Sequence, residues 1–268
     1  MELTFYQADA FTNKSFSGNP AAVMVLDEWL SDSQMLAIAN EMNLSETAFL
    51  VPNSKDTFDF DIRWFTPLSE IDLCGHATVA SAHVLFRHMN FSGDIIHFSS
   101  LSGHLSCALR PDKKLELDFP IRPLSDDTVS QALVDALGAT PTRVQTNATR
   151  IQAVFDTSEQ IAALNPDMAL LKKLPQYGVC CTAIGDGEHD DVDFVCRFFA
   201  PAKGINEDPA TGSAYTSLVP YFAQSHNKTA FTARQLSQRG GEISLELCGD
   251  RVKIAGDAVT VIKGQFYL

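Results

Sequence analysis

Apolar residues along this chain occur mostly in short alternating or continuous runs, and long helical patterns are few. Residues 58–65 alternate apolar and polar side chains, which is typical of a half-buried strand. Residues 21–26 form a continuous apolar run, which is typical of a buried strand. Residues 31–41 predict a helix with Ser31 as its N-cap. This mixture of many strands and few helices predicts an α/β or α+β protein with mixed sheets.

A short segment at residues 73–78, Leu-Cys-Gly-His-Ala-Thr, joins a glycine turn to an apolar helical pattern that continues to about residue 89. A second segment at residues 210–214, Ala-Thr-Gly-Ser-Ala, also leads into a mostly apolar stretch, in which we expect Pro220 to end or kink the helix. The start of a helix presents backbone N–H groups and partial positive charge. Each turn is therefore a candidate anion site.

The two turns belong to a longer repeat. Arg-Trp-Phe-Thr-Pro at residues 63–67 precedes the first turn, and Arg-Phe-Phe-Ala-Pro precedes the second turn 134 positions later, which is half of the 268 residues. A strand, a loop and a glycine-started helix repeated at half the chain length predict an internal duplication. We therefore expect an N-terminal half of residues 1–119, completed by residues 257–268, and a C-terminal half of residues 120–256.

The composition excludes several classes of partner. The net charge of −13 repels nucleic acid and anionic membrane surfaces. No apolar run is long enough to span a membrane, and the N-terminal pattern does not resemble a signal peptide, so we expect a cytoplasmic protein. The six cysteines and seven histidines show no metal-ligand spacing, and the chain has no nucleotide-binding motif, so we expect neither a metal site nor a cofactor.

Glu46 is a candidate catalytic residue because of its position between a polar turn at residues 43–47 and an apolar strand pattern at residues 48–51. The local pattern alone allows either a solvated loop carboxylate or a carboxylate held at the mouth of a pocket. Burial beside Phe49 and Leu50 would raise the pKa of this group, as a proton donor and acceptor requires.

Several motifs, taken in order along nearly the whole chain, resemble the phenazine-biosynthesis PhzF-like family. They are Gly-Asn-Pro-Ala-Ala-Val at residues 18–23, Asn-Leu-Ser-Glu-Thr-Ala-Phe at 43–49, Phe-Thr-Pro at 65–67 with Glu70, Leu-Cys-Gly-His-Ala-Thr at 73–78, and Glu-Asp-Pro-Ala-Thr-Gly-Ser-Ala at 207–214. The resemblance implies a diaminopimelate-epimerase-like α+β fold with two similar halves. Each half would be a curved mixed sheet wrapped round a central helix, with the active site in the cleft between them. It also implies a homodimer.

The resemblance further implies a cofactor-independent isomerase that moves a proton on a small carboxylate or amino-acid-like substrate. Glu46 would be its general acid and base, and His76, Asp208 and Ser213 would orient the substrate or help to shuttle the proton. Backbone N–H groups of one glycine turn or the other would bind the substrate carboxylate. The expected substrate-binding residues are Gly75, His76, Ala77, Asp208, Thr211, Gly212, Ser213 and Ala214.

Related epimerases use one cysteine in each glycine turn, which provides an alternative. This chain has Cys74 in the first turn but Thr211 in the second, and a threonine hydroxyl is too weakly acidic to replace a thiol. We therefore do not expect a two-thiol racemase, although Cys74 could be a second acid/base beside Glu46. An epimerase, a lyase that uses the same base, and a non-catalytic small-molecule binding or interaction protein remain the alternatives, because a fold does not determine its function.

Overall fold

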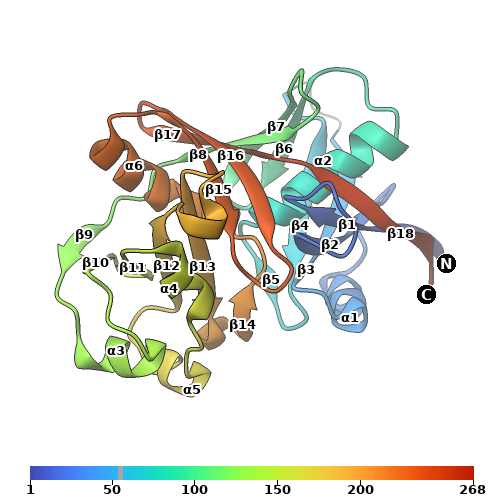
Figure 1. Cartoon of the computed structure of the whole chain (residues 1–268). Helices are drawn as coiled ribbons and strands as arrows, with labels where there is room; N and C mark the ends of the chain where they lie inside the picture. Colours follow the sequence, from blue (N-terminus) through green and yellow to red (C-terminus); the bar gives the residue numbers. More distant parts are fainter. Residues whose placement is uncertain (54–56) are drawn as a thin grey trace. The chain divides into compact units, whose positions relative to one another are not determined.

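A computed structural model describes residues 1–53 and 57–268 of the chain. The chain folds into two compact units, one made of Met1–Asp118 with Ala255–Leu268 and the other of Phe119–Ile254 (Figure 1). The sequence analysis expected the first unit to end at residue 119 rather than 118, and to resume at residue 257 rather than 255. Both units consist of many strands and few helices, so the fold is mixed α+β as the sequence predicts. In the described part of the chain, no helix is long and apolar enough to cross a membrane.

The first unit is a mixed sheet with two helices. Its pairings give the strand order β18-β1-β2-β3-β4-β6-β7-β8, with the short β5 paired to β4. The strands are β1 (Glu2–Ala10), β2 (Asn19–Val25), β3 (Glu46–Pro52), β4 (Phe60–Phe65), β5 (Glu70–Ile71), β6 (Ile95–Ser100), β7 (Gly103–Leu109), β8 (Leu115–Pro120) and β18 (Ala258–Tyr267). The helices are α1 (Asp32–Met42) and α2 (Gly75–His88).

The two helices of this unit differ in burial. Helix α1 begins after the expected N-cap Ser31, whose side chain accepts a hydrogen bond from Gln34 N–H, and it ends at Asn43 in the left-handed conformation. Helix α2 contacts β1, β2, β3, β7 and β18. Nearly every residue from His76 to Leu85 is buried, so α2 is enclosed on nearly all sides, as a central helix should be.

The strands of the second unit pair both parallel and antiparallel, in the order β9-β10-β11-β12-β13-β15-β16, with the short β14 paired to β13. The strands are β9 (Ser125–Asp127), β10 (Arg143–Thr146), β11 (Arg150–Val154), β12 (Gly178–Ile184), β13 (Phe194–Ala200), β14 (Ile205–Asp208), β15 (Ala230–Gln235), β16 (Gly241–Cys248) and β17 (Arg251–Gly256). The helices are α3 (Gln131–Leu137), α4 (Ser158–Ala163), α5 (Met168–Leu171) and α6 (Tyr215–His226), and the 3₁₀ turns are η1 (Gly187–His189), η2 (Pro201–Lys203) and η3 (Gly212–Ala214).

The two units share one sequence of strand pairings. In the first, β2 and β3 are parallel, β3 and β4 are antiparallel, β4 carries the short β5, and β6 returns parallel to β4. In the second, β11 and β12 are parallel, β12 and β13 are antiparallel, β13 carries the short β14, and β15 returns parallel to β13. Helix α2 and helix α6 occupy the same place in these two series, directly after the short strand.

The repeated Arg-aromatic-Phe motif has a structural role in each unit. Arg63 on β4 donates from Nε and Nη2 to the Glu70 carboxylate of β5, at 2.7 and 2.6 Å. Arg197 on β13 binds Glu207 of β14 in the same way, at 2.7 and 2.9 Å. Each guanidinium also lies over the aromatic ring two positions further along, at 5.2 and 5.0 Å. The motif therefore holds the short strand that leads into each glycine turn.

Replacing Arg197 with methionine should destabilise the protein by about 2–3 kcal/mol, because it leaves a carboxylate without its partner. The side chains of Arg197 and Glu207 are only 13% and 21% exposed, and Arg197 Nη1 also donates to the carbonyls of Ile161 and Leu164. The free energy of unfolding measured by urea denaturation tests this. Arg143→Met is the control, because the pair of Arg143 with Asp126 is largely exposed and should contribute little. Equal losses in the two variants would contradict the prediction.

The sequence predicts that Pro220 ends or kinks its helix. Pro220 does not end it, because α6 continues from Tyr215 to His226 with Pro220 inside it. A proline lacks the N–H that would donate to the carbonyl four residues earlier, which here belongs to Thr216. That carbonyl instead accepts a hydrogen bond of 3.0 Å from the backbone N–H of Arg122. A distant segment of the same unit thus satisfies the group that proline leaves open.

Candidate active site

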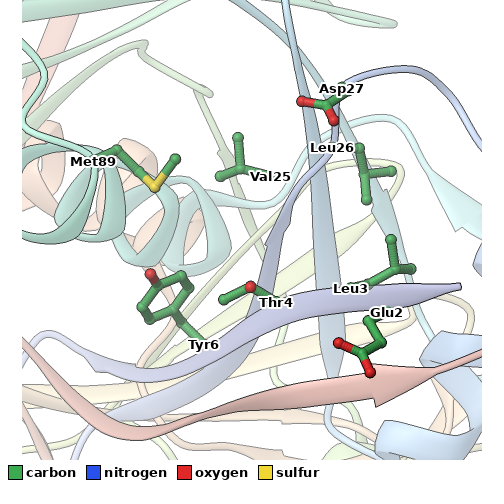
Figure 2. A pocket seen from close by; sticks show the side chains of 8 residues that line it. All are labelled: Glu2, Leu3, Thr4, Tyr6, Val25, Leu26, Asp27 and Met89. Atoms are coloured by element: carbon green, nitrogen blue, oxygen red, sulfur yellow. The ribbon is translucent and has the colours of Figure 1, made fainter.

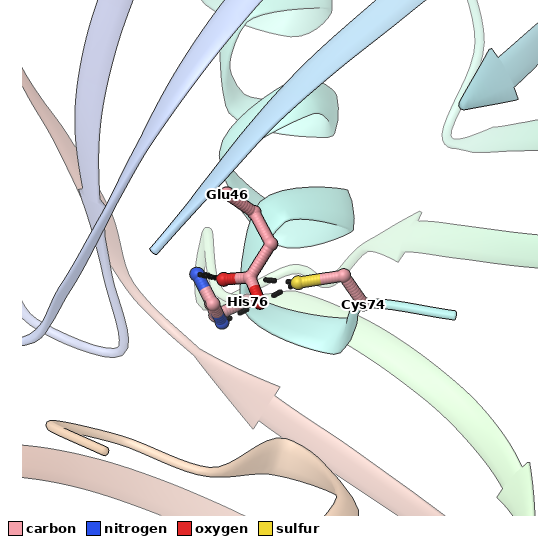
Figure 3. Close-up of side chains that lie close together, drawn as sticks. All are labelled: Glu46, Cys74 and His76. Atoms are coloured by element: carbon pink, nitrogen blue, oxygen red, sulfur yellow. Dashed lines mark hydrogen bonds and ion pairs between the residues drawn. The ribbon is translucent and has the colours of Figure 1, made fainter. Parts of the chain in front are cut away.

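Glu46, Cys74 and His76 come together in the first unit from two elements. Glu46 is the first residue of β3, which starts three residues after Asn43 ends α1. Cys74 is the N-cap of α2, and His76 is the second residue of that helix. Because β3 lies against the central helix α2, the carboxylate at the start of the strand meets the first turn of the helix. Figure 3 shows the three side chains converging on one point.

The central contact is an ion pair between Glu46 and His76. Glu46 Oε2 lies 3.1 Å from His76 Nε2, and both residues are only 6% exposed. Ser45 Oγ lies 3.5 Å from the same ring nitrogen. Cys74 Sγ lies 3.5 Å from His76 Nδ1 and 3.9 Å from Nε2 (Figure 3). A proton could therefore pass between the carboxylate, the imidazole and the thiol over short distances.

Asn19 is a member of this site that the sequence interpretation assigned no role. Its side-chain Nδ2 lies 3.1 Å from His76 Nδ1, and the residue is fully buried at the start of β2. This contact lies on the Nδ1 side of the ring, and Nε2 faces Glu46. Asn19 belongs to the Gly-Asn-Pro motif, which could have marked it as a candidate. Its partner His76 is 57 residues away, so the local pattern does not show the contact.

The pKa of Glu46 differs from the expectation. Burial alone would raise it, and this is the largest single effect, but the charge and hydrogen bonding of His76, with contacts from Ser45 and Cys74, outweigh burial and lower it below 4.5. The raised pKa that the sequence predicts for Glu46 is therefore wrong. Burial in turn would lower the pKa of His76, but Cys74 and Glu46 together raise it well above 6.5. With Cys74 as a thiol, it is the Glu46 carboxylate that favours the imidazolium form of His76.

Cys74 is a thiol under the same conditions. Burial and then the negative charge of Glu46 raise its pKa to about 11, against the opposing effects of His76 and of a hydrogen bond from the Ala77 backbone. A neutral thiol can donate a proton but is a poor acceptor. The resting state of the site therefore has one base, the Glu46 carboxylate.

The same three residues offer one ligand atom each within 4.8 Å of one another, and these are ligand types that zinc accepts. The expectation of no such cluster is wrong, because spacing along the sequence does not show that Glu46 packs against the turn at Cys74. His83 and His88 direct their Nε2 atoms to Thr260 Oγ1, at 2.9 and 2.8 Å, and so join α2 to β18. Burial lowers the pKa of His83 to about 4.

The backbone of the first turn lies where the sequence predicts. The first hydrogen bond of α2 runs from Thr78 N–H to the Cys74 carbonyl at 3.1 Å, so the N–H groups of Gly75, His76 and Ala77 precede it. The Ala77 N–H is directed toward the Cys74 thiol. This leaves Gly75 and His76 as the positions of this turn that are suited to an anion.

The second turn lies in the second unit and differs in detail from the expectation. Gly212–Ala214 form a 3₁₀ turn, and the α-helix itself begins only at Tyr215. Ala214 N–H donates to the Thr211 carbonyl at 3.0 Å and is thus used within the turn. Thr211 Oγ1 donates to the Asp208 carboxylate at 2.5 Å. The backbone N–H groups of Gly212 and Ser213 are therefore the candidates for binding a ligand at this turn, and the N–H of Ala214 is not.

Two buried residues that the sequence interpretation missed support this second turn. Gln235, which is fully buried on β15, accepts a hydrogen bond from Thr211 N–H at 2.8 Å and donates to the Asp208 carbonyl at 2.5 Å. Arg150, at the start of β11, donates to the Ser213 carbonyl at 2.7 Å and to Ser213 Oγ at 3.1 Å. Neither residue belongs to a recognisable motif, so the sequence alone does not indicate that they support this turn.

A pocket of about 270 Å³ also lies in the first unit, but away from these residues (Figure 2). Its lining residues are Glu2, Leu3, Thr4, Tyr6, Val25, Leu26, Asp27 and Met89. They include none of Glu46, Cys74 and His76. The convergent titratable groups, rather than this pocket, therefore mark the candidate active site.

Solved structures share this fold. A PhzF-family phenazine biosynthesis protein of Enterococcus faecalis superposes with a TM-score of 0.94 and 41% identity, and the match covers 100% of both chains. A hydroxyproline epimerase of Agrobacterium vitis has the same fold, with a TM-score of 0.63 at 10% identity, over 98% of this chain and 92% of that one. The fold is therefore diaminopimelate-epimerase-like, as the sequence predicts, and the protein is an enzyme of the isomerase class.

The family follows from two further comparisons. The family model for phenazine biosynthesis-like proteins matches residues 8–264. An uncharacterized isomerase of Pseudomonas aeruginosa is 48% identical over 268 residues, which is 100% of both chains. The chain belongs to the phenazine biosynthesis-like PhzC-PhzF family.

Proposed function

We propose that this protein is a cofactor-independent isomerase that moves a proton on a small carboxylate or amino-acid-like substrate, with Glu46 as the general acid and base. The observation that supports this most directly is the buried ion pair of Glu46 and His76 at 3.1 Å, at the first turn of the central helix α2. The adjoining imidazolium keeps Glu46 in the carboxylate form that can accept a proton, and burial keeps water away from the two groups.

The proposed reaction has two proton transfers. The Glu46 carboxylate first removes a proton from a substrate carbon and becomes a carboxylic acid, while the substrate retains the electron pair as a delocalised anion. The imidazolium of His76 offsets the negative charge that moves from Glu46 onto the substrate. Glu46 then returns the proton to a different carbon, which completes the isomerisation and restores the resting ion pair.

The backbone of the glycine turns would bind the anionic part of the substrate. The candidates in the first turn are the N–H groups of Gly75 and His76. The alternative is the second turn, with the N–H groups of Gly212 and Ser213 and with Asp208 and Thr211 shaping that turn. We further infer that the two units arose by internal duplication, because they share their strand pairings and the Arg63 and Arg197 ion pairs.

Proton exchange in heavy water tests the proposed function. The protein is incubated with a panel of small carboxylates and cyclic amino acids, and deuterium incorporation and isomer formation are followed by mass spectrometry. Exchange with formation of a shifted double bond would support the isomerase. Exchange at a stereocentre alone would favour an epimerase, and loss of water would favour a lyase. Binding of panel compounds without any exchange would favour a non-catalytic binding protein.

An epimerase with one catalytic cysteine is the second candidate, favoured by the position of Cys74 Sγ 3.5 Å from His76 Nδ1. Replacing Cys74 with serine separates the two functions. If Glu46 carries the proton, exchange should fall by less than about 10-fold, because a thiol with a pKa of about 11 is not the base. A loss of about 100-fold or more would make Cys74 a proton carrier. Cys248→Ser is the matched control, since Cys248 is the exposed cysteine.

A further inference from the structure

Glu46, Cys74 and His76 bring three different kinds of ligand atom to one buried point (Figure 3). Glu46 Oε2 lies 3.1 Å from His76 Nε2, and Cys74 Sγ lies 3.9 Å from the same nitrogen. A tetrahedral zinc ion has bonds of about 2.0 Å to oxygen and nitrogen and about 2.3 Å to sulfur, which set its ligand atoms roughly 3.3–3.6 Å apart. The two observed separations bracket this range, so small side-chain rotations would bring the ligand atoms to zinc.

Glu46 Oε2 is a buried atom whose bonding is incomplete. The residue is only 6% exposed, and among the described residues no group makes a well-formed hydrogen bond to this oxygen. His76 Nε2 is close enough for an ion pair but does not supply that bond. A buried carboxylate oxygen in this state gains from a further partner. A metal cation between the oxygen, the imidazole and the thiol would be such a partner.

The charges of the three side chains suit a divalent cation. On metal binding, Cys74 and His76 each release one proton, so that the site consists of a carboxylate, a thiolate and a neutral imidazole. The two negative charges then balance a divalent ion, as a buried site requires. The net charge of −13 also attracts cations to the protein. Sulfur and imidazole ligands favour Zn²⁺ over Mg²⁺ and Ca²⁺, which prefer oxygen.

Asn19 lies where a second-shell partner of the metal ligand is expected. When Nε2 of His76 binds the metal, Nδ1 carries the ring proton and needs an acceptor. The side-chain amide of Asn19 lies 3.1 Å from Nδ1, and a half-turn of the amide would present its oxygen to that proton. Three protein ligands also leave the fourth tetrahedral position to water or to a small carboxylate.

We propose that Glu46, Cys74 and His76 form a Zn²⁺-binding site whose occupation blocks proton transfer by Glu46. The lone pair with which the carboxylate accepts a proton from substrate carbon is then bound to the metal, so the ion is an inhibitor and not a cofactor. Zinc binding does not depend on the proposed function, whereas the inhibition rests on it. The two can therefore fail separately.

Titration of the reduced, untagged and chelator-treated protein with Co²⁺ tests the site, because cobalt accepts the same ligands and a cobalt-bound thiolate absorbs in the near ultraviolet. In the parent this band should saturate at one ion per chain, and Zn²⁺ should displace it. Cys74→Ser should lack the band, and Cys248→Ser, which removes the exposed cysteine, should retain it. In Glu46→Gln and His76→Gln the affinity should fall at least about 100-fold, since even loss of a second-shell partner costs about 10- to 100-fold.

Deuterium exchange at buffered free metal concentrations tests the inhibition. Zn²⁺ should abolish exchange over the concentration range in which it displaces Co²⁺, a chelator should restore exchange, and Mg²⁺ should have no effect. Absence of the cobalt–thiolate band in the parent, its persistence in Cys74→Ser, or an unchanged affinity in both Glu46→Gln and His76→Gln would overturn the site. Full exchange with zinc bound would overturn the inhibition. If no panel compound exchanges at all, the proposed function fails, and the cobalt titration still decides the metal site.

Discussion

Glu46→Gln should reduce proton exchange by between about 100-fold and 10,000-fold, the range that positioned acid/base groups contribute. Glutamine keeps the shape of the side chain but can neither accept a proton from carbon nor return it. In the resting state Glu46 is the group of the three that can accept a proton, because His76 holds a proton and the pKa of the Cys74 thiol is about 11. No neighbouring group should substitute for it at neutral pH.

The variant should still fold. Loss of the Glu46 charge removes one of the effects that raise the pKa of His76, and the burial of the ring then favours its neutral form. Circular dichroism and the unfolding temperature check this point, and exchange rates are measured only on folded protein. Glu41→Gln, on the exposed face of the adjacent helix α1, is the control and should retain full exchange. Unchanged exchange in Glu46→Gln would remove this residue as the proton carrier.

His76→Gln should lower exchange at neutral pH by about 100-fold and move the acid limb of the pH profile upward. In the parent protein the ion pair exists between the pKa of Glu46, which is below 4.5, and the pKa of His76, which is well above 6.5. Exchange should therefore be maximal across that window. It should fall on the acid side as Glu46 is protonated, and on the alkaline side as His76 loses its proton.

Without His76, burial becomes the dominant effect on Glu46 and raises its pKa. The acid limb of the variant should then lie at higher pH than that of the parent, and the alkaline limb should disappear. Rates of deuterium exchange across the pH range measure both changes. His104→Gln serves as the control, since His104 is exposed and its partner is His97, at 3.0 Å. An acid limb at the same pH in parent and variant would show that His76 does not control the proton affinity of Glu46.

Motifs that are contiguous in sequence predicted the fold, and they contain Glu46, Cys74 and His76, which the structure brings together. The glycine turns, the Arg63 and Arg197 repeats and the position of Glu46 beside a strand are local patterns, and they agree with the elements that carry them. The residues that were missed act through contacts between distant segments. Asn19 reaches His76 across 57 positions, and Arg150 reaches Ser213 across 63 positions.

The errors have the same physical origin. Burial was one of two alternatives that the local sequence allowed for Glu46, and burial alone would raise its pKa. The local sequence does not show that the His76 ring lies 3.1 Å away. It shows that Pro220 lacks an N–H group, but not that Arg122 satisfies the carbonyl that is left open. In both cases a correct local rule was outweighed by a tertiary partner.

The hydrogen bonds of Gln235 have a consequence for the thermodynamics of ligand binding. One buried amide holds Thr211 through both its N–H and its hydroxyl, and holds Asp208 through its carbonyl. The loop between β14 and the 3₁₀ turn therefore has its shape before any ligand arrives. Ordering a flexible loop on association would subtract conformational entropy from the affinity, and a loop that is ordered in advance avoids that loss. Affinity at this turn should consequently be dominated by enthalpic contacts and by desolvation.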